Sequence, residues 1–223
     1  MKSKLLVLDL RILTLGAALL LATTLFGQEQ QTSAESNLKA KFGIKGGFDL
    51  TTLYSSDVST SHMKPGFDAG VFAKLPLTRG FSIQPELLYS LKGAKSDYSN
   101  FIQGSGEYRF NLGYVQLPLL AVVNIAPNFS LHAGGYAAYL VNANIKNVDD
   151  NGNLQGATEL NTGDFNRWDF GLAGGAAFDI ENFTIGARYN YGLSEIGKSG
   201  SASGDLTKGQ KNAGFSFYLG FGF

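Results

Sequence analysis

The sequence predicts an all-β fold: an eight-stranded antiparallel up-and-down transmembrane β-barrel preceded by a signal peptide. Three observations lead to this prediction. Apolar side chains recur at every second position over eight segments, the connections between segments alternate between long and short, and charged side chains fall in the polar phase of the strands. A period of two defines a strand with two unlike faces, and about ten residues per segment suits a strand that crosses a membrane.

The N-terminal residues have the pattern of a secretory signal. Lys2 and Lys4 precede an apolar run over Ile12–Phe26, and the chain turns polar at Gln28. About fifteen apolar residues are too few for a transmembrane helix but suit a signal peptide. We therefore expect cleavage near Gly27, with an uncleaved anchor as the alternative.

The rest of the chain suits one domain. We expect a signal peptide at 1–27, a flexible periplasmic lead at 28–39 and the barrel at 40–223, in the outer membrane of a Gram-negative cell. Without residues 1–27 the chain has 15 basic and 17 acidic residues, so no basic surplus favours nucleic acid. The absence of cysteine excludes a lipoprotein anchor and a disulfide framework.

Eight segments satisfy the strand pattern, and two kinds of connection separate them. The segments are 41–50, 66–77, 81–92, 107–125, 129–144, 167–180, 183–193 and 213–223. Long polar loops are expected at 51–65, 96–106, 145–166 and 195–211, with tight turns at 78–80, 126–128 and 181–182. Long outer loops and short periplasmic turns are typical of outer-membrane barrels, and an even strand number places both termini on the periplasmic side.

The fourth segment changes phase. Its apolar residues stand at even positions from Tyr108 to Tyr114 and at odd positions from Val115 to Ile125. A shift of one residue turns every later side chain to the other face, so we expect a bulge near Gly113.

The distribution of charge distinguishes a membrane barrel from a soluble one. Within the segments assigned to lipid the apolar phase carries no charge, and aromatic residues stand near the strand ends. A soluble barrel would have an apolar interior and a charged exterior. We therefore expect a structural polar network in the lumen, made of Lys45, Asp49, Asp68, Lys74, Glu86, Lys92, Arg109, His132, Asp169, Asp179 and Arg188.

The size of the barrel limits what this lumen can do. The interior of an eight-stranded barrel is just wide enough to be filled by side chains. Because charges withdrawn from water need partners, the main interpretation is a plug of ion pairs. A narrow ion or proton path through the same residues is the alternative, and the pairing depends on strand register.

No catalytic, metal or cofactor site is expected. His132 has Ser82 and Ser130 as conceivable neighbours, but a hydrogen-bonded lumen histidine is the simpler interpretation. The run at 149–153 offers oxygen ligands for calcium but lacks the glutamate at EF-hand spacing, and its Asn-Gly pair is a common turn signal. We therefore expect a protein that is not an enzyme and carries no cofactor.

Five short stretches carry a family resemblance, namely 41–48, 81–89, 116–120, 133–136 and 186–193. Their order and spacing resemble the PorT-like outer-membrane β-barrel family of Bacteroidetes over residues 40–223. The resemblance implies an eight-stranded outer-membrane barrel with little chemistry of its own, and the family's namesake is associated with a protein-secretion system. The terminal Phe223 also resembles the C-terminal aromatic of barrels inserted by the β-barrel assembly machinery, which makes it a candidate insertion signal.

The expected function is a structural or interaction role, in which outer loops or the barrel rim contact envelope or secretion-system proteins. The expected partners also include outer-membrane lipid and the β-barrel assembly machinery, but no nucleic acid. The alternative is a narrow ion-transport or small-ligand-binding barrel that uses the charged lumen.

Overall fold

The computed structural model describes residues 38–54, 62–100, 104–149, 154–160, 162–197 and 209–223. The predicted signal peptide at 1–27 and most of the predicted lead at 28–39 lie outside these residues, so both stay predictions. Within the described ranges, no helix has the length and apolar character needed to cross a membrane.

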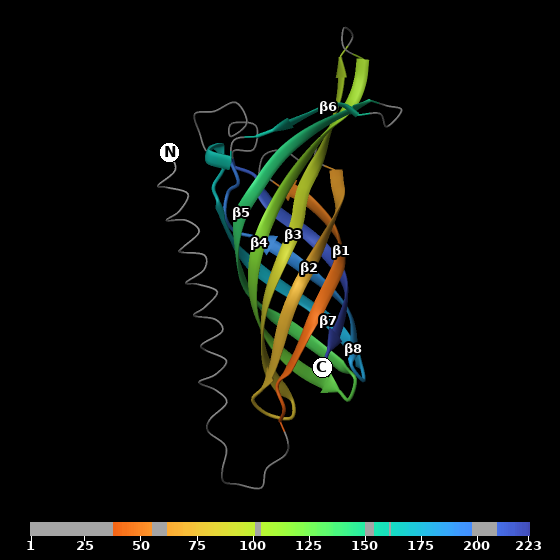
Figure 1. Ribbon diagram of the computed structural model, residues 1–223, viewed down its shortest axis with the longest axis vertical. Helices are drawn as coiled ribbons and strands as arrows, with labels where there is room; N and C mark the ends of the chain where they lie inside the picture. Colours follow the sequence, from red (N-terminus) through yellow and green to blue (C-terminus); the bar gives the residue numbers. More distant parts are fainter. Residues whose placement is uncertain (1–37, 55–61, 101–103, 150–153, 161, 198–208) are drawn as a thin grey trace. The chain divides into compact units, whose positions relative to one another are not determined.

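The described residues are almost entirely strands (Figure 1). The strands are β1 Lys41–Tyr54, β2 His62–Pro76, β3 Phe81–Asn100, β4 Gly104–Ala126, β5 Phe129–Asp149, β6 Leu154–Glu159, β7 Trp168–Ile180, β8 Phe183–Gly192 and β9 Lys211–Gly222. One 3-10 turn, η1 Thr162–Asp164, lies between β6 and β7.

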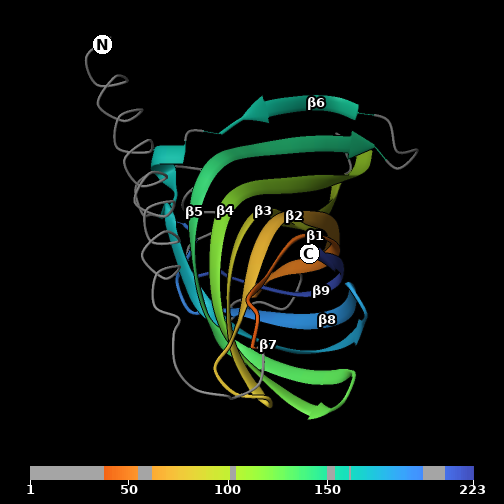
Figure 2. The ribbon, with the colours of Figure 1, turned by 60° about the horizontal axis from the view of Figure 1, so that its bottom comes forward.

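Eight of these strands close into a barrel. Their order around the sheet is β4-β3-β2-β1-β9-β8-β7-β5, and a further pairing between β4 and β5 completes the ring. Neighbouring strands are antiparallel throughout. β6 pairs only with the outer part of β5 and lies outside the ring (Figure 2). The predicted eight-stranded antiparallel barrel is confirmed.

The three tight turns lie at one end of the barrel, as predicted. The first turn is closed by hydrogen bonds from the backbone N–H of Leu77 and Thr78 to the carbonyl of Phe81, at 2.9 and 3.0 Å. β4 and β5 are separated by two residues, as are β7 and β8. Glu181, in the last turn, has a φ of 54°, as a two-residue hairpin turn requires. Short turns mark the periplasmic end.

The outer connections differ from the prediction of four long loops. The predicted loop 96–106 is mostly strand, because β3 continues to Asn100 and β4 begins at Gly104. The predicted loop 145–166 contains the end of β5, the strand β6 and η1. The backbone groups of paired strands satisfy one another whatever the side chains are, so a polar sequence does not end the ladder.

The irregularity predicted near Gly113 is present, but the extra residue lies on the partner strand. Gly113 is opposite Asn142 and Tyr114 is opposite Leu140, which leaves Val141 as the additional residue on β5. β4 itself pairs with β3 in one continuous register. β4 therefore does not change phase.

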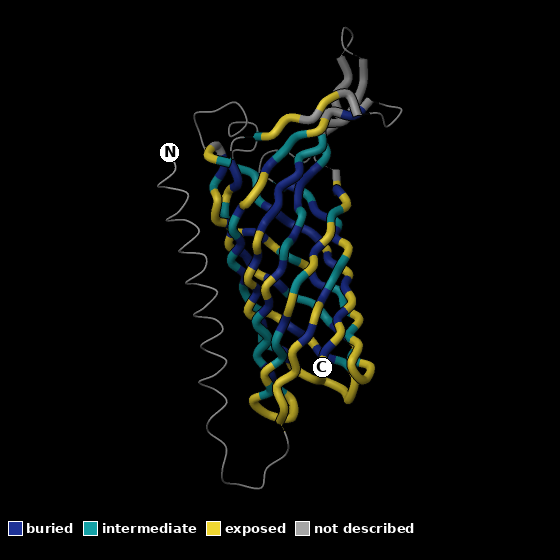
Figure 3. Tube along the Cα trace, viewed as in Figure 1, coloured by how far each residue is buried: buried dark blue, intermediate teal, exposed yellow. Residues whose placement is uncertain are grey.

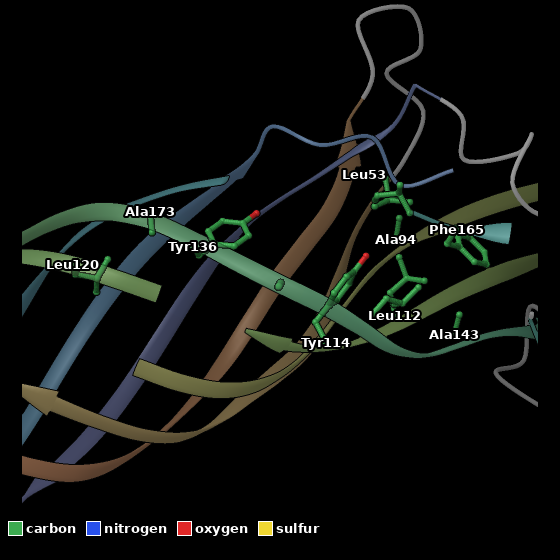
Figure 4. Packing of buried hydrophobic residues seen from close by; sticks show 12 residues of the cluster. Leu53, Ala94, Leu112, Tyr114, Leu120, Tyr136, Ala143, Phe165 and Ala173 are labelled. Atoms are coloured by element: carbon green, nitrogen blue, oxygen red, sulfur yellow. The ribbon is translucent and has the colours of Figure 1, made fainter. Parts of the chain in front are cut away.

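This register corrects the direction of several apolar side chains. Leu112 and Tyr114 were predicted to face lipid, but both are buried inside the barrel. They belong to a cluster at the outer end of the lumen, shown in Figure 4, which we call the outer plug: Leu53, Ala94, Leu112, Tyr114, Ala143, Phe165 and Ile196. Phe165 and Ile196 come from the segments before β7 and after β8, and the Asn166 backbone N–H donates to the Ile196 carbonyl at 2.8 Å.

The wall of the barrel is apolar on its outer face. Exposed and buried residues alternate along the strands (Figure 3), and the exposed ones include Phe217 and Leu219 on β9. On β7 the exposed apolar residues extend from Trp168 to Ile180. That is about 40 Å of strand, which at a tilt of about 40° covers roughly 30 Å, close to a transmembrane band.

Aromatic side chains border this band at both ends. On the outer side, Tyr139 contacts Trp168 with ring centroids 5.2 Å apart. On the periplasmic side, Phe183 contacts Phe221 at 5.1 Å. Girdles of this kind are typical of barrels in the outer membrane.

Glycines give the lumen room for its aromatic rings. Tyr136 on β5 is opposite Gly171 on β7, and Tyr218 on β9 is opposite Gly186 on β8. In both pairs the tyrosine ring occupies the space that a Cβ on the glycine would need. Close approach of this kind explains part of the high glycine content.

Candidate functional site

Glu86, Arg188 and Lys45 form the centre of the lumen network. They come from β3, β8 and β1, and each side chain lies on the inward phase of its strand. Arg188 donates Nη1 and Nη2 to the two Glu86 carboxylate oxygens, at 2.8 and 2.7 Å. Lys45 Nζ lies 3.2 Å from Glu86 Oε2. The three residues are 3%, 3% and 5% exposed, so one carboxylate serves two cations away from bulk water.

Further contacts fix this triad. Gln84 donates Nε2 to Glu86 Oε1 at 2.8 Å. Lys45 Nζ lies 3.5 Å from the centre of the Tyr218 ring, which provides a cation–π contact. The triad retains one net positive charge, and it bridges strands that are far apart in the sequence.

A second group surrounds Asp169 nearer the outer end. Lys92 Nζ lies 3.5 Å from Asp169 Oδ2, and Asn212 donates Nδ2 to the same oxygen at 2.9 Å. The Tyr136 hydroxyl lies 3.4 Å from it. Lys92 also lies 4.4 Å from the centre of the Tyr136 ring.

Asp49 and Asp68 lie between these two groups. Both carboxylates are buried, and the register places Asp49 opposite Ser216. Ser216 donates its hydroxyl to Asp68 Oδ2 at 2.6 Å. The middle and outer lumen is therefore filled with side chains that hold one another in place.

The periplasmic end of the lumen has its own ion pair. Lys74 Nζ lies 2.8 Å from Asp179 Oδ2, and Thr184 donates its hydroxyl to Asp179 Oδ1 at 2.6 Å. Both partners are less enclosed than the central triad, with side chains 19% and 30% exposed.

His132 lies in the lumen beside Tyr218. It is 5% exposed, and its Nε2 lies 3.5 Å from the Tyr218 hydroxyl. Ser130 donates its hydroxyl to the Ala177 carbonyl at 3.5 Å instead. Within the described ranges no cluster of side chains could hold a metal ion. The predicted run at 149–153 lies outside them except for Asp149.

Arg109 is an exception among the eleven predicted lumen residues. Because β4 keeps one phase, Arg109 shares the outer face with the exposed Val115 and Leu117. It lies opposite Lys95 on β3 and Lys146 on β5, beyond the apolar band. The prediction failed because Leu112 and Tyr114, further along the same strand, belong to the outer plug and do not face lipid.

Lys64 lies close to this basic row. Its pKa is below the usual value, first because the ammonium is buried and then because Arg109, Lys146 and Lys95 raise the local positive potential. The register therefore brings three cations, Arg109, Lys95 and Lys146, onto adjacent strands beyond the apolar band.

Several lumen contacts were not predicted from the sequence. Tyr218, Asn212 and Ser216 face inward from β9, where the alternation alone could have assigned them to the lumen. Phe165 and Ile196 lie in segments predicted to be loops, and no periodic signal marks them.

A cavity of about 210 Å³ lies between the central triad and the periplasmic turns. Its walls include Lys45, Lys74 and His132 from the strands, with Arg79 and Asn182 from the turns. The network therefore closes the middle and outer lumen but leaves space at the periplasmic end.

The closed barrel, its apolar band and its buried ionic lumen define an integral outer-membrane β-barrel protein. Residues 26–197 match the family model for the outer membrane protein beta-barrel domain, and the chain belongs to that family. No curated protein matches the chain.

Solved structures of bacterial outer-membrane proteins are similar to this chain at low identity. Ail, the attachment invasion locus protein of Yersinia pestis, is 13% identical with a TM-score of 0.47, over 83% of this chain and 99% of that chain. Neisserial surface protein A is 12% identical with a TM-score of 0.48, over 83% and 99%. OprG from Pseudomonas aeruginosa is 13% identical with a TM-score of 0.41, over 82% and 96%.

Proposed function

We propose that this protein is a non-conducting outer-membrane barrel with a structural or interaction role and no catalytic activity. The observation that carries the proposal is the double closure of the lumen. The central triad blocks the middle, and Phe165 and Ile196, which are 0% and 1% exposed, are packed into the outer end. A solute would have to displace both barriers.

The test of closure is single-channel recording with purified protein in planar bilayers. We expect no conductance steps above background from the wild-type protein. A Phe165→Gly/Ile196→Gly variant should also stay closed, because the triad remains in place below the outer plug. Large, persistent conductance of the wild-type protein would refute the proposal.

The interaction role is proposed for the outer extension of the sheet. β3 and β4 pair from Lys95–Arg109 to Asn100–Gly104, beyond the aromatic girdle, and β6 widens this surface alongside β5 (Figure 1). Among the described residues β3 pairs beyond Lys95 with β4 alone, so its other edge offers backbone groups to a partner without disturbing the wall in the membrane. Envelope or secretion-system proteins are the proposed partners, in line with the PorT-like resemblance.

Cross-linking in native membranes, followed by purification, tests this role. The comparison is between wild type and a variant in which residues 97–107, at the tip of the β3–β4 hairpin, are replaced by a two-residue turn that joins the paired positions 96 and 108. The proposal expects the variant to reach the outer membrane, fold, and lose a cross-linked partner that wild type retains. Identical cross-link patterns would argue against this surface.

A ligand-binding role that uses the charged lumen is the second candidate. The cavity of about 210 Å³ at the periplasmic end favours it, because this is the part of the interior that the described side chains leave open. The closed region above the cavity favours binding over passage.

A further inference from the structure

The cavity at the periplasmic end is surrounded by an unequal number of positive and negative groups. Among the described residues, the basic ones in its lining are Lys39, Lys41, Lys45, Lys74 and Arg79, whereas Asp179 is the one acidic residue. Lys74 and Asp179 neutralise each other at 2.8 Å. The remaining lining therefore carries a clear positive excess.

The carboxylate above the cavity does not remove this excess. Glu86 accepts from Lys45 and also from Arg188, and Asp68 lies beyond the triad as seen from the cavity, so the excess comes from the basic residues of the lining. At the floor, Lys41 donates Nζ to the Glu181 backbone carbonyl at 2.8 Å, which positions its ammonium without neutralising it. A concave site lined by one sign of charge, with low-dielectric walls, concentrates ions of the opposite sign.

The inner wall is built from enclosed polar groups. Lys45, His132 and Ser82 line the cavity and are 5%, 5% and 2% exposed. Lys45 is held between Glu86 and the Tyr218 ring. Ser130 and Thr184 add hydroxyl groups to the same wall. A ligand would meet ammonium and hydroxyl donors that are already in position.

The chemistry and the size of the cavity together select a class of ligand. We propose that this cavity binds a small oxyanion, such as inorganic phosphate or a phosphate monoester, that enters from the periplasm. A phosphate group accepts hydrogen bonds on several oxygens and is bound most strongly by charged donors. The cavity has a volume of about 210 Å³, many times the roughly 10–15 Å³ that one water molecule needs, so a small oxyanion fits inside it.

The inference deepens the ligand-binding candidate and does not require transport. The triad and the outer plug close the lumen above the cavity, so the oxyanion would leave by the route it entered. Binding and conductance are measured in separate experiments. Conductance through the barrel would refute the closed lumen and leave the anion site to the binding experiment. Absence of oxyanion binding would refute the anion site and leave the closed lumen to the conductance experiment.

Isothermal titration calorimetry with inorganic phosphate tests the site, using the full mature chain in neutral detergent at constant ionic strength. Wild type should bind phosphate, and Lys41→Gln/Arg79→Gln should bind at least about tenfold more weakly, because two charged donors are lost. The matched control is Lys95→Gln/Lys146→Gln, which removes the same net charge beyond the opposite end of the lumen and should bind like wild type. Absence of binding to wild type, or equal weakening in both variants, would overturn the proposal.

Two further measurements guard against a folding defect and identify the source of the anion. Phosphate should raise the urea midpoint of wild type above its value in chloride at equal ionic strength, which needs no variant. Glycerol phosphate in solution should compete with inorganic phosphate for the cavity. The protein in nanodiscs that contain phosphatidylglycerol should bind inorganic phosphate with the same affinity as the protein in nanodiscs of phosphatidylcholine. Competition by phosphatidylglycerol alone would refute a soluble ligand and assign the site to lipid headgroups.

Discussion

The replacement of Glu86 by Gln tests the central triad most directly. Glu86 is the one carboxylate shared by Arg188 and Lys45, at 2.7 and 3.2 Å. At an effective dielectric constant of about 20, each attraction has a gross value of about 5–6 kcal/mol, and desolvation of the charges offsets a large part of it. Glu86→Gln removes both attractions and leaves two enclosed cations facing each other.

We expect Glu86→Gln to lower the free energy of unfolding by about 3–5 kcal/mol, the range for a buried charge that loses its partner. Lys45→Met should cost less than about 2 kcal/mol, because Glu86 and Arg188 still neutralise each other. The double variant should recover at least about 1 kcal/mol relative to Glu86→Gln, because one of the two unbalanced cations is gone.

The assay is reversible urea unfolding in lipid vesicles, followed by tryptophan fluorescence. The chain has a single tryptophan, Trp168, which is 53% exposed on the lipid-facing surface, so its emission reports the loss of the membrane-inserted barrel. A Glu86→Gln variant within about 0.5 kcal/mol of wild type would refute the reasoning. So would a Lys45→Met variant as unstable as Glu86→Gln, because the ranking follows from charge balance.

Three further predictions concern the wall and the C-terminus. Phe217→Arg should destabilise the barrel in lipid by about 2–4 kcal/mol and Ile125→Arg by about 0–1 kcal/mol, because Phe217 lies further inside the band than the girdle residue Phe221 and Ile125 lies near the interface. Equal urea midpoints would contradict the lipid-facing assignment. Gly186→Ala should lower the urea midpoint because its Cβ would collide with the tyrosine ring above it, whereas Gly80→Ala should not, since its Cβ would meet no atom within 4 Å. Phe223→Ala should reduce the amount of barrel in the outer membrane of cells but not refolding into vesicles, as an insertion signal requires; unchanged amounts on immunoblots would exclude that role.

The alternation in the sequence was enough to predict the barrel and most of its lumen. A strand has only two faces, so a residue's parity decides whether it faces lipid or the lumen as long as the strand stays regular. Lys45, Glu86 and Arg188 stand in the polar phase of long regular segments, and each is buried where the pattern predicts. The tight turns could also be predicted from the sequence, because few residue types suit them.

Arg109 and the outer plug were not predictable by the same means. Apolar residues such as Leu112 and Tyr114 have the same appearance in the sequence whether they face lipid or pack inside the barrel, and the extra residue that shifts the register is Val141 on β5. A bulge moves register by one residue, and its effect on one strand is visible only against its neighbours.

The sequence by itself determined that eight amphipathic strands form a barrel with an apolar exterior and a charged interior, because side-chain alternation and the aversion of charge to lipid are local properties of each strand. Tertiary structure alone decided that Glu86 pairs with Arg188, 102 positions away, and that the space left over lies at the periplasmic end. Those outcomes depend on how the registers of all eight strands accumulate around a closed ring, and no single segment contains that information.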